Sequence, residues 1–120
     1  MTTKAKTNEC ITLGTVSEAV ADTTDIAGAR ERLKYLIGRK VILPGACVLK
    51  RIKRHEHLKL WLESGEASMK VFAEFTRAKD AERVVERKVR KRSKVSVIGE
   101  LVSLGYQAVC LNNCRLVDGN

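Results

Sequence analysis

The sequence has few aromatic residues, little proline and no long apolar run, and the last of these excludes a membrane-spanning helix. One Trp, two Tyr and two Phe are its only aromatic residues, and it has a single proline. No run approaches the roughly 20 apolar residues that a membrane-spanning helix needs. The N-terminus has no basic segment followed by an apolar one, so it predicts no secretory signal. From these absences we expect a cytosolic (cytoplasmic) chain without a membrane span.

The four cysteines and two histidines form no metal-binding pattern. None of Cys10, Cys47, Cys110 and Cys114 belongs to a C-x-x-C pair, the spacing typical of zinc sites. Cys110 and Cys114 are four residues apart on a predicted strand. They would share a face but lie about 13 Å apart, which is too far for a disulfide. We expect reduced cysteines that pack as small apolar residues, with no metal and no other cofactor.

The motifs of common enzymes are also missing. The sequence has no Gly-rich phosphate loop, no nucleophile motif and no H-E-x-x-H helix. His55, Glu56 and His57 are consecutive in a predicted loop and lack the helical spacing of a metalloprotease site. The other acidic residues are scattered among basic ones and are typical of ion-pair partners. We therefore expect no catalytic activity.

Basic residues are abundant and unevenly distributed. The chain has 23 Lys and Arg against 14 Asp and Glu, a net charge of +9. Residues 1–25 hold two Lys and four acidic residues, a net of −2, so residues 26–120 hold 21 basic and ten acidic residues, a net of +11. An excess of this size attracts polyanions, nucleic acid first and an anionic membrane surface second.

Apolar spacing predicts one domain preceded by a tail. Residues 1–25 show little periodicity apart from a short helix that could form over 16–21, and we expect a flexible N-terminal tail there. Asp25 can cap a helix over 26–37, which Gly38 ends. Strands are predicted over 40–50, 58–63, 68–75, 94–101 and 108–117, with a helix over 77–90 that Thr76 caps.

The order strand, strand, strand, helix, strand, strand is that of the OB-fold. Residues 26–120 are therefore predicted to be mostly β. They would form a five-stranded OB-fold Greek-key barrel with a helix between strands 3 and 4 and an extra N-terminal helix. Pro44 and Gly45 interrupt the first strand. Such an interruption favours the sharply curved strand of a small barrel over a flat sheet.

Four features of this region form a recognisable pattern: an aromatic residue near the end of a helix, a central Gly in the next strand, a late Val-x-Val-x-Gly strand and a closing Val-x-Leu-x-x-Cys-x-Leu strand. The residues are Tyr35, Gly45, Val95–Val97–Gly99 and Val109–Leu111–Cys114–Leu116. With this pattern, residues 26–118 resemble the OB-fold family related to the anticodon-binding domains of tRNA synthetases. The resemblance covers about three quarters of the chain, and it implies a nucleic-acid-binding barrel. The matching residues are mostly structural, so they specify the fold more than the function.

Trp61 and Phe72 form the first candidate site. Strand alternation places both on the outward face of the second and third strands, beside Lys59 and Lys70. Aromatic rings that stack on bases, with cations nearby for phosphates, are what single-strand binding requires. The alternative is that the N-terminal helix lies over this face and that both aromatic side chains pack against it.

Three further groups are candidates, each with a structural alternative. The basic loop predicted between the first two strands could border a ligand groove or be a solvated hairpin tip. The tyrosine in the loop after the fourth strand could stack on a base or plug the barrel end. The basic end of the second helix could contact nucleic acid or be a solvated surface. The residues are Lys50, Arg51, Lys53 and Arg54; Tyr106; and Arg87, Lys88, Lys91 and Arg92.

Together these features predict non-enzymatic binding of single-stranded DNA or RNA, with little sequence specificity and with an affinity that falls as salt rises. The alternative is a protein-protein interaction or assembly module built on the same barrel, with a protein partner or a homo-oligomer. No membrane partner is expected.

Overall fold

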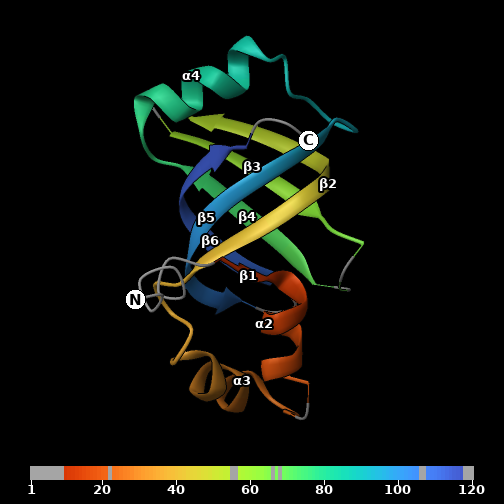
Figure 1. Cartoon of the computed structure of the whole chain (residues 1–120), viewed down its shortest axis with the longest axis vertical. Coiled ribbons are helices and arrows are strands. Elements are labelled where there is room, and N and C mark those ends of the chain that lie inside the picture. The colour runs from red at the N-terminus through yellow and green to blue at the C-terminus, as the bar shows by residue number, and fades with distance from the viewer. Residues whose placement is uncertain are drawn as a thin grey trace, which may run out of the picture.

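The computed structural model describes residues 10–21, 23–54, 57–65, 67, 69–105 and 108–117. In this part of the chain, five strands close into a barrel with helices at both ends (Figure 1). The strands are β2 (Lys40–Arg54), β3 (His57–Glu63), β4 (Lys70–Phe75), β5 (Lys94–Gly105) and β6 (Ala108–Leu116). A short strand β1 (Ile11–Thr12) precedes them, and the helices are α2 (Leu13–Ala19), α3 (Ile26–Leu33) and α4 (Ala78–Glu86).

The strand order confirms the predicted barrel. It runs β2-β3-β4-β6-β5, and a further pairing between β5 and β2 closes the sheet. All neighbours are antiparallel except β4 and β6, which are parallel. Helix α4 lies between the third and fourth barrel strands, and β1 adds a short parallel strand to β2.

The barrel core follows directly from strand alternation. Leu58, Leu60 and Leu62 of β3 are almost fully buried, as are the facing residues of β4, while the residues between them are half-buried or exposed. Burying a Leu, Val or Phe side chain contributes about 1.5–3 kcal/mol. Helix α4 covers one end of the barrel through the fully buried Val84.

Strand β2 is longer than predicted, and its register shifts at two places. It spans 15 residues, and its register against β5 shifts between Leu43 and Ala46, at the Pro44–Gly45 interruption. A second shift, against β3, falls between Val48 and Lys50. Bulges bend a strand without ending it. The loop predicted between the first two strands is therefore wrong for Lys50–Arg54, which pair with His57–Trp61 as strand.

The N-terminal boundary at residue 25 is wrong for residues 11–21, which belong to the folded domain. The side chain of Thr12 caps α2 by accepting a hydrogen bond from the backbone N–H of Thr15 at 3.2 Å. Leu13 and Val16 are fully buried in the core, and α2 packs against α3 and β2. Two apolar residues are too few to show helical periodicity, so the sequence pattern did not reveal this packing.

Both predicted helices form, but each is shorter than expected. Asp25 caps α3 as predicted, since its Oδ1 accepts from the N–H of Gly28 at 2.8 Å. The helix ends at Leu33 and turns follow it as far as Gly38. Helix α4 has Arg77 as its N-cap. Thr76 is not the cap, because its hydroxyl donates to Oδ1 of Asn113 at 2.5 Å.

Cys110 and Cys114 do not share a face, contrary to the expectation from strand alternation. Cys110 pairs with Phe72, which points outward, whereas Cys114 is fully buried. Between them Asn113 has a φ of 50°, and the register with β5 shifts in the same region. A bulge adds one residue to the strand, so the side chains beyond it change face.

Candidate functional site

The outer face of β3 and β4 holds Trp61 and Phe72, the aromatic pair. The two residues lie directly opposite each other on adjacent strands, so their side chains share a face. Their rings are stacked, with centroids 5.0 Å apart and planes 27° from parallel. Both side chains are half-buried, because Leu60, Leu62, Val71 and Ala73 take the inward positions beside them.

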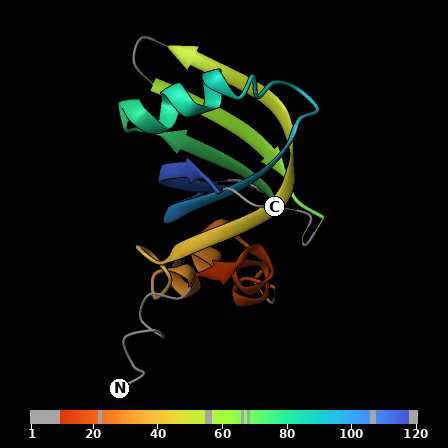
Figure 2. The same ribbon diagram turned by 45° about the horizontal axis from the view of Figure 1, so that its top comes forward.

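Helix α3 does not cover the aromatic pair. It packs mainly against β5 and α2, at the end of the barrel opposite α4 (Figure 1, Figure 2). Its Leu33 is buried there, and Nε of Arg30 donates to the carbonyl oxygen of Leu104 at 3.1 Å. The alternative in which the N-terminal helix buries this face is therefore wrong.

Three lysines surround the aromatic pair. Lys50 lies directly opposite Trp61 across the β2–β3 pairing. Lys59 precedes Trp61 by two residues and Lys70 precedes Phe72 by two, so both share the outward face. Lys50 and Lys59 are exposed and Lys70 is half-buried. The structure thus brings together five of the predicted site residues on one surface, the aromatic face.

Two carboxylates moderate the charge of the aromatic face. Glu63 lies opposite Lys70, and Glu74 lies opposite Lys59. The carboxylate of Glu74 is also 3.5 Å from Nδ1 of His57, a contact that is an ion pair only when His57 is protonated. Because three lysines face two glutamates, the face is only weakly positive.

The stacked geometry changes how the aromatic pair could hold a base. The ring faces that are turned toward each other are covered, so each ring could offer a base only its opposite face or its edge. Nε1 of Trp61 is buried and has no hydrogen-bond acceptor among the described residues. A buried unpaired N–H costs about 1–3 kcal/mol, so packing against Phe72, and not a hydrogen bond, holds the indole in place.

The other predicted residues of the first two strands lie away from the aromatic face. Arg51 and Lys53 lie opposite the inward-pointing Leu60 and Leu58. Nη1 of Arg51 donates to the carbonyl oxygen of Val89 at 3.2 Å, so Arg51 braces the segment after α4. Lys53 lines a hollow between β3 and α4. The side chain of Arg54, and Tyr106, lie outside the described residues.

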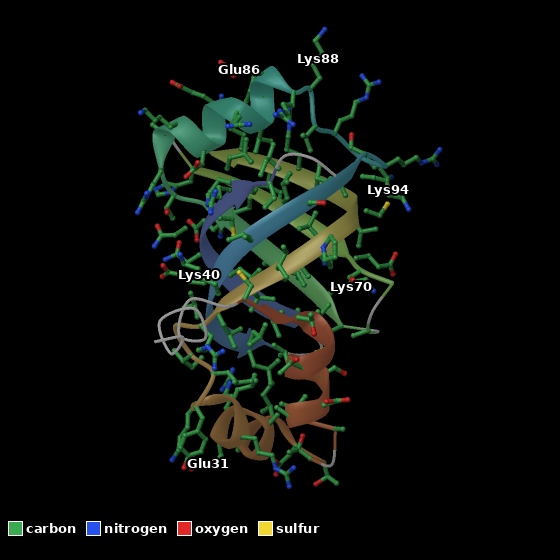
Figure 3. The ribbon with its side chains drawn as sticks, viewed as in Figure 1. Glu31, Lys40, Lys70, Glu86, Lys88 and Lys94 are labelled. Atoms are coloured by element: carbon green, nitrogen blue, oxygen red, sulfur yellow. The ribbon has the colours of Figure 1, made fainter. Side chains whose placement is uncertain are left out.

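Residues 87–94, the basic connection, follow α4 and contain six Lys and Arg in eight positions. Figure 3 shows Lys88 beyond the end of α4 and Lys94 at the start of β5. The connection is fastened to β2, because Arg92 N–H donates to the carbonyl of Val48 at 2.7 Å and Val48 N–H donates to that of Ser93 at 2.8 Å. It therefore runs two strand spacings, about 10 Å, from β3. The predicted residues Arg87, Lys88, Lys91 and Arg92 are all exposed.

The described residues include no group of three or more His, Cys, Asp and Glu side chains placed to hold a metal ion; His55 lies outside them. All four cysteines are free. Burial raises the pKa of the Cys114 thiol to about 12, so this thiol is protonated and unreactive at neutral pH. Across the same residues, no helix is long and apolar enough to cross a membrane.

Comparison with known proteins identifies a fold but no family. No family model and no curated protein matches the chain. Among solved structures it is similar to a putative nucleic acid-binding lipoprotein from Klebsiella pneumoniae subsp. pneumoniae MGH 78578. The TM-score is 0.63 and the identity 10%, over 97% of each chain. It is also similar to a putative aspartyl-tRNA synthetase from Leishmania major Friedlin, with a TM-score of 0.49 and 14% identity. That match covers 96% of this chain and 22% of the other.

At such identities the similarity shows the fold alone. The first match extends along nearly the whole of both chains, so it covers the N-terminal elements as well as the barrel. It also contradicts the expected cytosolic location, because the similar structure is that of a lipoprotein. That expectation from the sequence is therefore wrong.

Proposed function

We propose that this chain binds single-stranded nucleic acid without catalysing a reaction, using the aromatic face together with the basic connection. The observation that carries the proposal is the stacked Trp61–Phe72 pair with Lys50, Lys59 and Lys70 around it, on a barrel face that α3 leaves open. Aromatic rings supply stacking for bases, and lysines supply contacts for phosphates.

The chemistry of this face favours binding with little sequence preference. Every base presents a π-face, so a stacking platform accepts all four. A lysine acts as a point charge and selects no particular base. The net charge of +9 adds long-range attraction for any polyanion. The name of the similar Klebsiella structure, a nucleic acid-binding lipoprotein, supports the same general class of ligand, and either DNA or RNA would satisfy these contacts.

Titration of a fluorescent poly-pyrimidine strand tests this proposal. Trp61→Ala is expected to weaken binding by about 1–3 kcal/mol, which is roughly 5-fold to 150-fold. Tyr35→Ala is the matched control, because it removes an aromatic ring that is 78% exposed, just after α3 and away from the aromatic face. It should bind like the original chain. Thermal unfolding of both variants separates a loss of binding from a loss of fold.

Two results would refute the proposal. One is the absence of binding to any oligonucleotide even at low salt. The other is equal affinity of Trp61→Ala and the original chain, which would leave charge alone to hold the strand. Trp61 is the sole tryptophan, so quenching of its fluorescence by oligonucleotides but not by heparin gives an independent sign of stacking.

A second candidate function is protein assembly through the end of the barrel near α3. Tyr35, Ile37 and Val102 expose 78%, 46% and 46% of their surface, and Ile37 and Val102 line one shallow hollow. Light scattering on the purified protein tests it. A stable dimer that dissociates in Ile37→Glu would favour assembly, whereas a monomer at high concentration excludes self-assembly through this surface.

A further inference from the structure

A cavity of about 490 Å³ lies beside the basic connection, at a place that the aromatic face does not use. Arg87 and Lys94 contribute cations to its lining, Ser93 and Ser96 contribute hydroxyls, and Val89 and Leu116 contribute apolar surface. No acidic side chain is among its described lining residues, although the chain has 14 Asp and Glu. The charged side chains in the described part of the lining are therefore all positive.

Irregular backbone from two distant segments borders this cavity. At the β2 bulge Gly45 has a φ of +60°, and its N–H donates to Oγ of Ser96 at 3.1 Å and not to a ladder carbonyl. In the basic connection Lys88 and Arg92 have φ values of 55° and 77°. Left-handed backbone costs a non-glycine residue about 1–2 kcal/mol. Such strain gathers at ligand sites, and here it falls in the basic connection that borders the cavity.

Each of the two serine hydroxyls in the lining keeps a proton that it can donate to a ligand. Oγ of Ser96 already accepts from Gly45, and Oγ of Ser93 accepts from the N–H of Arg90 at 3.0 Å. A hydroxyl has one proton to donate, and the described residues offer neither of these protons an acceptor. The cavity thus combines two cations with two O–H donors, a set that matches the several acceptor oxygens of a phosphate.

The size and the apolar part of the cavity indicate what is attached to the phosphate. A volume of about 490 Å³ is within the range of roughly 300–1,000 Å³ that small-molecule sites occupy, and it exceeds what an inorganic phosphate fills. Val89 and Leu116 are 3% and 6% exposed and supply an apolar wall. We propose that the cavity binds a nucleotide through its phosphate, with the nucleoside against this wall, independently of strand binding at the aromatic face.

Calorimetric titration of the full chain with three probes tests the proposal. Adenosine 5′-monophosphate should bind, adenosine should bind at least about tenfold more weakly, and inorganic phosphate should compete with the nucleotide. Lys94→Gln should weaken nucleotide binding by about tenfold or more, because it removes a charged hydrogen bond. Lys91→Gln is the matched control, since Lys91 carries the same charge in the same connection but does not line the cavity.

A second arm distinguishes a free nucleotide from the phosphorylated end of a strand. If the cavity takes a strand end, a 5′-phosphorylated oligonucleotide binds more tightly than its 5′-hydroxyl counterpart, and Lys94→Gln abolishes that difference while Trp61→Ala keeps it. If it takes only free nucleotides, the two oligonucleotides bind alike and adenosine 5′-monophosphate still binds. The proposal is overturned if the nucleotide does not bind, or if Lys94→Gln binds it as Lys91→Gln does. Neither result concerns strand binding, which Trp61→Ala reports.

Discussion

If the chain binds a strand as proposed, the salt dependence of the affinity reports how many lysines contact phosphates. For a single strand, each neutralised phosphate contributes about 0.7 to the slope of log K against log salt. The aromatic face presents Lys50, Lys59 and Lys70, so binding confined to it predicts a slope of about −2. If the six cations of the basic connection also contact the strand, nine contacts predict a slope of about −6.

Single substitutions turn this count into a test of place. Lys50→Gln should make the slope shallower by about 0.7, because Lys50 is exposed directly beside Trp61. Lys79→Gln removes the same charge from an exposed position on α4 and should leave the slope unchanged. The assay is fluorescence anisotropy of a labelled strand between about 50 and 200 mM salt.

An unchanged slope in Lys50→Gln would refute the placement of the strand on the aromatic face. If Lys91→Gln made the slope shallower in the same experiment, the strand would lie on the basic connection alone. Equal losses in Lys50→Gln and Lys79→Gln would mean that only the overall charge matters, and not the position of any lysine.

Three further predictions concern the packing beneath the site. In Gly99→Ala the new Cβ would collide with Sγ of Cys114 and lie 3.1 Å from Cβ of Leu111. The free energy of unfolding measured in urea should therefore fall by about 1–3 kcal/mol, and Gly99→Ala/Cys114→Ala should recover part of it. Unchanged stability of Gly99→Ala would contradict this packing. Burial raises the pKa of the Cys114 thiol from 9.0 to about 12. The contribution of the buried neutral thiol to the free energy of unfolding is therefore present below pH 9 and is lost between pH 9 and 12, at up to about 1.4 kcal/mol per pH unit. Cys114→Ala should lack this part of the alkaline decline in urea unfolding. Trp61→Phe removes the unpaired Nε1 but keeps a ring against Phe72. The affinity of this variant for a strand should therefore stay within about threefold of that of the original chain. A loss of affinity as large as that of Trp61→Ala would show that the indole itself is needed.

The alternation in β3 and β4 was sufficient to predict the aromatic face. Leu58, Leu60 and Leu62 alternate with Lys59 and Trp61, and a period of two assigns each set to one side of a strand whatever the strand pairs with. The same local signals predicted the order of the barrel elements and the Asp25 cap. They depend only on near neighbours in the chain, so the sequence by itself determined them.

Tertiary structure alone decided the features that depend on a partner far along the chain. The bulges in β2 and at Asn113 moved Lys50–Arg54 into a strand and Cys114 into the core, and a bulge exists only against the strand that it pairs with. The same is true of the stacking between Trp61 and Phe72, and of the docking of α3 on β5 that leaves them open. The cavity beside the basic connection needs three distant segments to meet, so spacing within any one of them contains no sign of it.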